Sequence, residues 1–151
     1  MDALIAPYAK VLDDLHRDAT AISTPLSDDA VNRRVPGLQN TVGMLLRHMA
    51  GSERYWVGEV VGGIPANRNR DAEFGADRVE KATVLAEMDR AAATTRQVLT
   101  GLRAADLLAD VEVRRPQGTV KEARGQSLLH ATQHLAYHLG QLRILAKLVQ
   151  T

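Results

Sequence analysis

The sequence predicts an all-α protein: a four-helix bundle with an irregular stretch or short hairpin before the last helix. Three observations favour this fold. Four long segments place apolar residues every three to four positions, the spacing of one buried helical face. Clusters of Gly, Pro and polar residues separate these segments. Hydrophobic residues make up 45% of the chain and aromatic residues only 3%, which indicates a mainly aliphatic core of the kind that bundles use.

Length and charge limit the class of protein. With 151 residues, the chain is expected to form a single domain over residues 1–151. The formal charge of +1 gives no electrostatic footprint for nucleic acid or an anionic membrane. No apolar run is long enough for a membrane span, and the N-terminus lacks the apolar core of a signal peptide. A soluble cytoplasmic protein is therefore expected.

The chain contains no cysteine. This excludes disulfide bonds, thiolate metal ligands and a cysteine nucleophile. Any sulfur chemistry would need the thiol of a small molecule, and a metal site would have to use histidine and carboxylate ligands.

The first helix is predicted over residues 2–22. Pro7 lies near its first turn, where a missing amide is tolerated, and Pro25 closes the segment. His16 lies beside the apolar stripe and is expected to be partly exposed. The stripe comprises Leu4, Ile5, Tyr8, Val11, Leu12, Leu15, Ala19 and Ile22.

The second helix is predicted over residues 41–61, capped by Asn40 or Thr41 and stopped by the Gly-Gly-Ile-Pro run at 62–65. Glu53 falls within its apolar stripe, where a carboxylate without a partner is unfavourable. Residues 23–40 and 66–76 are interpreted as connections. The stripe comprises Val42, Leu45, Leu46, Met49, Trp56, Val57 and Val60.

The third helix is predicted over residues 77–99. Asp77 and Glu80 have the spacing of a capping box, and Gly101 is a natural C-terminal stop. Its candidate contacts are Ala82, Leu85, Ala86, Ala92, Ala93, Val98 and Leu99.

Residues 102–126 break the helical pattern. Residues 110–114 alternate in polarity, Pro116 to Gly118 form a turn signal, and Thr119 and Val120 provide a return strand. A short hairpin fits this stretch. The fourth helix is predicted over residues 127–149, with Ser127 as its cap.

The fourth helix carries His130, His134 and His138 at four-residue intervals. On an α-helix such residues lie one above the other, here on or beside the side of Leu142, Leu145 and Val149. The row is therefore predicted to face inward, where each imidazole needs a hydrogen-bond partner or a metal ion.

The residue pattern narrows the kind of metal site. The chain has no Glu-x-x-His pair for a di-iron carboxylate centre and no Cys-x-x-Cys-His for a c-type haem. What remains is a mononuclear site with His134, His138 and a donor from another helix, for which His48 is best placed. Three protein ligands with one open position are typical of catalytic zinc. A bundle that binds metal for stability or sensing, or a metal-free dimerisation module, remains an alternative.

Two blocks of the sequence resemble the DinB-like metal-dependent proteins. Residues 44–56, MLLRHMAGSERYW, resemble the second helix of that family. Residues 130–141, HATQHLAYHLGQ, resemble the last helix with its His-x3-His-Arg-Gly-Gln ending, although Leu139 stands where Arg is common. The likeness in helix spacing extends over nearly the whole chain.

The resemblance implies a metal site formed by His48, His134 and His138. It also implies an up-down-down-up bundle that binds a divalent ion, with zinc or nickel as the expected metal. Such bundles are often homodimers. The activity it implies is that of a thiol-dependent S-transferase or isomerase, which uses bacillithiol or mycothiol on a small-molecule substrate.

Four further residues are expected around the site. His130 is expected to hydrogen-bond rather than to bind the metal, and Glu53 to orient a histidine or pair with an arginine. Gln141 is expected to bind substrate or to satisfy backbone groups, and Tyr55 to reach the pocket or to lie in an interface. Water at the open position would give a metal-dependent hydrolase and a thiol a transferase, and the residues do not separate the two.

Overall fold

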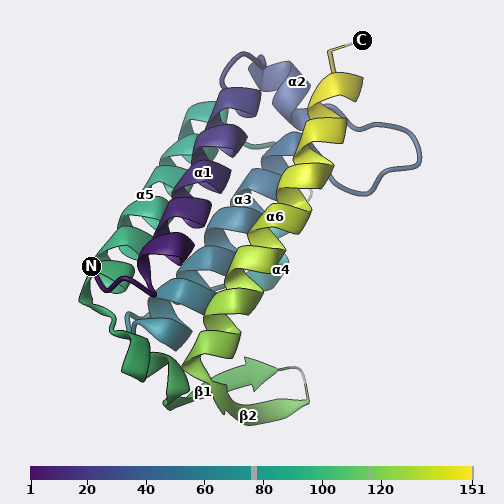
Figure 1. The fold of residues 1–151 in the computed structure, drawn as a ribbon. Coiled ribbons are helices and arrows are strands. Elements are labelled where there is room, and N and C mark those ends of the chain that lie inside the picture. The colour runs from purple at the N-terminus through teal and green to yellow at the C-terminus, as the bar shows by residue number, and fades with distance from the viewer. Residues whose placement is uncertain (76–77, 116, 151) are drawn as a thin grey trace.

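Four long helices lie side by side in the computed structural model, which describes residues 1–75, 78–115 and 117–150 (Figure 1). They are α1 (Ala6–Ser23), α3 (Val42–Glu53) with its π-helical continuation η1 (Arg54–Val61), α5 (Lys81–Gly101) and α6 (Arg124–Leu148). The shorter elements are α2 (Asp28–Asn32), α4 (Arg70–Glu73), the 3-10 helix η2 (Ala104–Leu108) and the strands β1 (Asp110–Arg115) and β2 (Gly118–Ala123). The predicted mostly helical bundle is confirmed.

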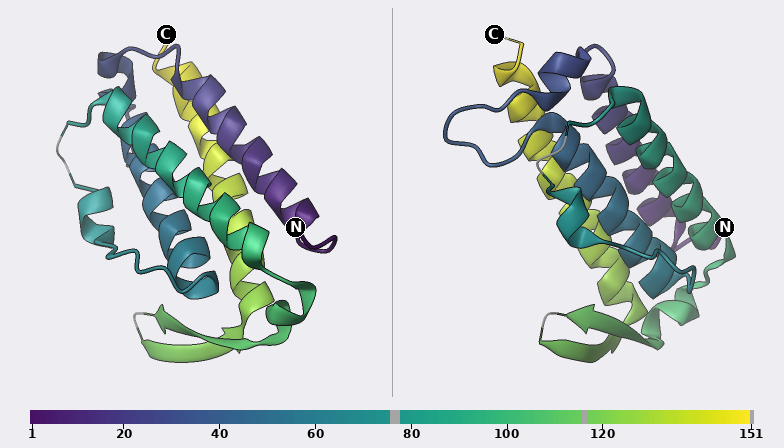
Figure 2. Two further views of the ribbon diagram at one scale, coloured as in Figure 1. Left: turned by 90° about the vertical axis from the view of Figure 1, so that its left-hand side faces the viewer. Right: turned by 180° about the vertical axis from the view of Figure 1, so that it is seen from behind.

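The helix directions follow the up-down-down-up order that the family resemblance implied (Figures 1 and 2). α1 and α6 run one way, and α3 and α5 run the other. α1 packs against α5 and α6, and α3 packs against the same two helices. Because α3 and α5 are parallel, the connection between them, residues 62–80, must return along the length of the bundle. That return carries α4 alongside α3, the helix that contains His48.

The second predicted stripe, from Val42 to Val60, is buried throughout. On α1 the prediction is partly wrong, because Leu4 is 66% and Val11 44% exposed. Leu4 precedes the helix, and Val11 lies off a buried face that repeats every three or four residues. His16 occupies a position on that face and is buried, contrary to the prediction that it is partly exposed. The face consists of Ala9, Leu12, His16, Ala19 and Ser23.

Three predicted helix starts differ from the structure. α1 begins at Ala6, four residues after the predicted start. α5 begins at Lys81, and the predicted cap Asp77 lies outside the described residues. α6 begins at Arg124, so Ser127 lies inside the helix instead of capping it. Its buried hydroxyl donates a 2.6 Å hydrogen bond to Glu122 Oε1 of β2. On α5, Ala82 and Ala93 are exposed, contrary to prediction. The buried face includes instead Val84, Met88 and Ala91, which the predicted contacts omitted.

The hairpin predicted before the last helix is present at one end of the bundle (Figure 1). β1 and β2 are antiparallel, with Val113 opposite Val120. Gly118 has a φ of 125°, a conformation that favours glycine. The hydroxyl of Tyr55 accepts from the amide of Arg114 at 2.9 Å and donates to its carbonyl at 3.2 Å. These two bonds attach β1 to η1.

The connections contain two short helices that the sequence pattern did not predict. Ser27 caps α2 and Asn69 caps α4 through their side chains, and Thr41 caps α3 in the same way, as predicted. With five and four residues, α2 and α4 are too short to show helical periodicity. Among the described residues, every helix is too short or too polar to serve as a membrane span.

Candidate metal centre

His130, His134 and His138 lie in a row along α6 that faces α3 and η1. Each stands one position before a fully buried residue, about 100° round the helix from the core face. The three imidazoles are half-buried. The prediction that the row shares the inward face is therefore corrected: the row borders that face. The buried face comprises Ser127, Leu128, Ala131, Leu135, Leu139, Leu142, Leu145 and Ala146.

His48 of α3 meets this row. Its side chain is buried, and its Nε2 lies 3.1 Å from Nε2 of His134. One ring nitrogen from each of His48, His134 and His138 lies within 4.8 Å of the other two. Two nitrogens bound to one tetrahedral zinc at their usual distance lie about 3.3 Å apart, close to the separation of His48 and His134. Within the described part of the chain, this is the one group of three such donors.

The second ring nitrogen of each histidine has a polar partner on the protein. Nδ1 of His48 lies 2.8 Å from Glu73 Oε2, Nδ1 of His134 lies 3.3 Å from Ser52 Oγ, and Nδ1 of His138 lies 2.7 Å from Gln141 Oε1. Carboxylate and amide oxygens only accept, so the proton of His48 and of His138 sits on Nδ1 and the lone pair on Nε2. Metal-binding histidines are held in this way, so the donor set fits a divalent ion such as zinc or nickel.

Burial favours the neutral form of two of the three histidines, His134 and His138. Burial and the neighbouring histidines, His138 and His48 first, lower the pKa of His134 to about 3. Burial also lowers the pKa of His138, although its bond to Gln141 acts in the opposite direction. Since a metal ion binds the neutral form of imidazole, these two side chains are ready to bind at neutral pH without releasing a proton.

Glu73 is the charged residue closest to the cluster. Its carboxylate is buried and is paired with Arg68 through Nε at 2.6 Å and Nη2 at 2.7 Å. Burial alone would raise the pKa of Glu73, but the hydrogen bonds from Arg68 and His48 and the charge of Arg68 outweigh it and lower that pKa. Glu73 is therefore ionised at neutral pH and only accepts hydrogen bonds.

Aromatic rings border the cluster. The ring of Phe74, directly after α4, lies 4.5 Å from the ring of His48, and the ring of Tyr137 lies 5.1 Å from that of His138. The indole of Trp56 lies 4.2 Å from the ring of His130. These apolar surfaces lower the local polarity around the nitrogens.

The structure brings two of the four accessory residues to the cluster. Gln141 bonds to His138, as described above. His130 packs on Trp56, and its ring centre lies 6.0 Å from that of His134, outside the converging group. Burial and the charge of Arg115 lower its pKa. Tyr55 contacts the hairpin backbone and so lies in the interface between η1 and β1.

Glu53 points away from the cluster, towards α1 and α5. Its Oε2 lies 2.6 Å from Nε2 of His16, at an angle outside that of a hydrogen bond, and its Oε1 accepts a 2.6 Å hydrogen bond from Thr95. All three side chains are buried. Glu53 therefore pairs with a histidine, but with one that lies outside the candidate metal centre.

Sequence reasoning missed Arg68 and Glu73. Both lie in the return connection, 20 and 25 residues after His48, where no helical spacing relates them to it. Ser52 was detectable, because it stands four residues after His48 on the same helix flank.

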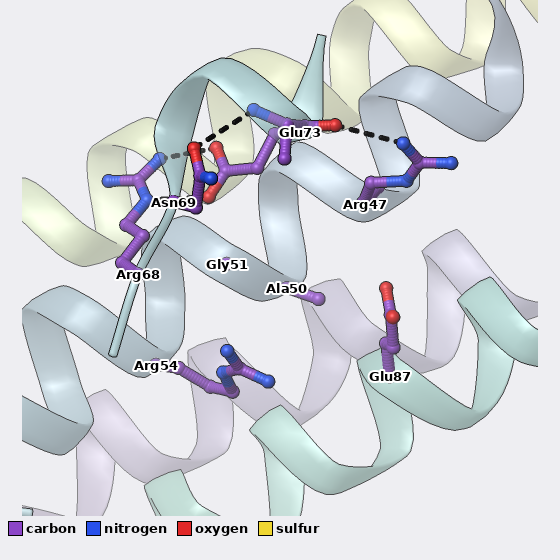
Figure 3. A pocket seen from close by; sticks show the side chains of 9 residues that line it. Arg47, Ala50, Gly51, Arg54, Arg68, Asn69, Glu73 and Glu87 are labelled. Carbon is purple, nitrogen blue, oxygen red and sulfur yellow. Dashed lines mark hydrogen bonds and ion pairs between the residues drawn. The ribbon is translucent and has the colours of Figure 1, made fainter. Parts of the chain in front are cut away.

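A small open cavity of about 140 Å³ lies beside Glu73, between α3, α4 and α5 (Figure 3). Its lining includes Arg68, Glu73 and Gly51 but none of the three histidines. Figure 3 shows the guanidinium groups of Arg47 and Arg54 at its edge, with Glu87 of α5 opposite Ala50. The cavity is thus a separate space on the outer side of the Glu73 carboxylate.

Comparison with known proteins agrees with this geometry. A crystal structure described as a conserved protein from Enterococcus faecalis superposes with a TM-score of 0.73, over 99% of this chain and 98% of that chain. Its 15% sequence identity means that this likeness shows the fold alone. Among curated proteins, none matches this sequence. The model of the mycothiol S-transferase family matches residues 8–150. The chain belongs to the mycothiol S-transferase family, a DinB-like family of helical bundles, as its two histidine-containing blocks indicated.

Proposed function

We propose that this protein is a divalent-metal-dependent S-transferase that uses mycothiol as its thiol. The observation that carries the proposal is the convergence of three imidazole nitrogens in a member of the mycothiol S-transferase family. The other nitrogen of each ring has a polar partner on the protein. Bacillithiol, which the sequence resemblance also implied, is the second thiol to test. The family match favours mycothiol over it.

His48, His134 and His138 would hold the ion through Nε2, with zinc or nickel as the expected metal. When bound, the ion supplies positive charge that lowers the pKa of a thiol close to it towards neutrality. The protein contributes orientation: Glu73, Ser52 and Gln141 hold the three rings. Because the chain has no cysteine, no protein thiol competes with the small-molecule thiol.

The transfer joins the thiol sulfur to an electrophilic carbon of a small molecule. With a haloarene, the new S–C bond replaces the C–halogen bond, the halide leaves with its electron pair, and the thiol proton passes to solvent. With an epoxide, the ring C–O bond breaks and the oxygen takes up the proton. Both reactions balance without a redox partner.

The metal requirement can be tested first. Protein purified without a chelator or a polyhistidine tag should contain up to about one divalent ion per chain, as a three-histidine site requires. Alanine at His48, His134 or His138 should each deplete the metal. His130→Ala is the matched control from the same row and should lose less, within the roughly 10–100-fold typical of outer partners. A metal-free His130→Ala beside a fully loaded His48→Ala would contradict the ligand assignment.

The thiol requirement is tested by a conjugation assay. Metal-loaded protein should transfer mycothiol to a haloarene or epoxide, whereas metal-free protein and His134→Ala should not. Bacillithiol, glutathione and coenzyme A serve as comparison thiols, beside a panel of esters and amides. Ester or amide hydrolysis without thiol turnover would identify a hydrolase. If no thiol changes the visible spectrum of the cobalt-substituted protein, the transferase proposal fails and a non-catalytic metal-binding bundle remains.

A homodimer in the cytoplasm completes the proposal, as the family resemblance and the composition implied. Exposed apolar side chains on α6, including Tyr137 at 63% and Ile144 at 60%, offer a surface for a second copy of the chain. Sedimentation should give twice the chain mass, and Ile144→Glu should shift it towards the monomer. Gln97→Glu, an exposed change on α5, is the control and should leave the mass unchanged. A wild-type monomer at all concentrations would exclude the dimer.

A further inference from the structure

The carboxylate of Glu73 is placed on His48 by the return connection between two parallel helices. Glu73 ends α4, and its Oε2 accepts a 2.8 Å hydrogen bond from Nδ1 of His48, 25 residues earlier. Both side chains are about 95% buried. Water therefore has little access to this bond, which strengthens it relative to an exposed one.

Arg68 holds the carboxylate from the other side. Its Nε lies 2.6 Å from Oε1 and its Nη2 lies 2.7 Å from Oε2, a two-point contact in which a guanidinium can only donate. The Arg68 side chain is itself 13% exposed, so the charge pair is mostly desolvated. Arg68 and Glu73 thereby form a rigid unit, and Oε2 of Glu73 in this unit also accepts the hydrogen bond from His48.

Gly51 makes room for this unit. A Cβ at position 51 would lie 2.1 Å from Oε1 of Glu73 and 2.8 Å from its Cδ, far inside contact distance. Gly51 stands three residues after His48 on α3, within a helix where glycine costs roughly 1 kcal/mol relative to alanine. The close approach of the carboxylate accounts for a glycine at this helical position (Figure 3).

We propose that Glu73 is a positioning residue that fixes the orientation and the tautomer of the His48 ring. Arg68 holds the carboxylate of Glu73, and Gly51 leaves the space for it. The Nδ1 proton of His48 then points at Glu73, and its Nε2 lone pair points at the divalent ion. The inference rests on the proposed metal site. It adds a residue triad, Arg68, Glu73 and His48, in which only the last touches the ion. A histidine fixed in this way loses no rotational freedom and no tautomer population when it binds the metal.

The test combines zinc affinity with the state of the His48 ring. Glu73→Gln keeps the size of the side chain but removes its charge, and should raise the zinc dissociation constant about 10–100-fold. Gly51→Ala should act in the same direction, because its methyl group displaces the carboxylate while favouring the helix. Glu87→Gln, a change of the same kind on the opposite side of the same cavity, should bind zinc like the wild type.

A merely structural role is distinguished by ¹⁵N NMR of the histidine rings in metal-free protein. Wild-type His48 should show the Nδ1–H form alone, and Glu73→Gln should show a mixture of both tautomers in a folded protein. Wild-type zinc affinity together with an unchanged ring in Glu73→Gln would overturn the proposal. If the wild type binds no zinc, the proposed function fails, yet the ring measurement still decides whether Glu73 sets the tautomer of His48.

Discussion

At the scale of single residues, the three rings of the cluster are held by groups of different strength. His48 has a charged acceptor, His138 a neutral amide, and His134 a hydroxyl at the longer distance of 3.3 Å. Charge-assisted hydrogen bonds are roughly twice as strong as neutral ones. The ring of His48 is therefore the most firmly oriented, and the outer partners should contribute unequally to metal affinity.

Gln141 offers a test of this ranking. Gln141→Ala removes the acceptor from Nδ1 of His138 and should weaken zinc binding by about tenfold, the lower end of the range for outer partners, because the lost bond is neutral. The measurement is competition with a chromophoric chelator. Gln133→Ala, an exposed change on the same helix, is the control and should leave the affinity unchanged. A larger loss in Gln141→Ala than in Glu73→Gln would reverse the ranking.

The residues of the candidate site were predictable where spacing along a helix relates them. His134 and His138 stand four residues apart, and His48 completed the set through its helix and the family resemblance. Arg68 and Glu73 were not predictable, because the contact with His48 depends on how the return connection lies against α3. The burial of His16 was not predicted for a related reason. Its partner Glu53 lies on another helix, so the sequence of α1 alone does not indicate that His16 is buried.

At the scale of secondary-structure elements, a buried polar group joins three helices. His16 of α1 faces Glu53 of α3, which also accepts from Thr95 of α5. The group fixes how these helices are rotated about their axes. Glu53 directly follows Ser52 on α3. The rotation of α3 that this group fixes therefore also sets the direction in which Ser52 and His48 point.

Removing one partner of this group should be costly. His16→Ala leaves the buried carboxyl group of Glu53 without its histidine neighbour and should lower the free energy of unfolding by about 1–3 kcal/mol. Chemical denaturation measures the change. The triple variant H16L/E53L/T95V replaces the whole polar group by apolar side chains and should recover most of the stability. Equal losses in both variants would mean that packing volume, not the unpaired polar group, causes the effect.

The attachment of the hairpin depends on one hydroxyl. Tyr55→Phe removes both hydrogen bonds to the backbone of Arg114, while the ring stays packed. We expect a loss of about 1–3 kcal/mol, since two partly buried hydrogen bonds of about 0.5–1.5 kcal/mol each are removed. Amide exchange at Val113 and Arg114 should accelerate, whereas exchange in the middle of α5 should change only with global stability. Unchanged exchange in β1 would show that other contacts hold the hairpin.

The long helices and the hairpin follow from the sequence because their patterns are local. Period and stop signals place the helices within a few residues. The π-helical register of η1 does not follow, because its residues continue the apolar stripe of α3 without a break. The start of α6 was misjudged for a similar reason: Ser127 has the chemistry of a cap, but its hydroxyl bonds to the preceding strand.

At the scale of the whole molecule, the metal ion should couple binding to folding. Zinc at a hundredfold excess over its dissociation constant adds about 2.7 kcal/mol to the stability of a protein that binds it only when folded. For a chain of this size, the midpoint of thermal unfolding should rise by roughly 5–10 °C. His134→Ala should lose this increment and His130→Ala should keep most of it. An equal rise in both variants would place the ion elsewhere.

The two halves of the cluster lie far apart in the chain, since His48 and His134 are separated by 86 residues. During synthesis, His48 and Glu73 leave the ribosome long before α6 exists, so a growing chain presents only one of the three donors. All three donors are present only when residue 138 has been made. Under the proposed function, a chain truncated before α6 therefore keeps only His48 of the three donors and should not hold zinc.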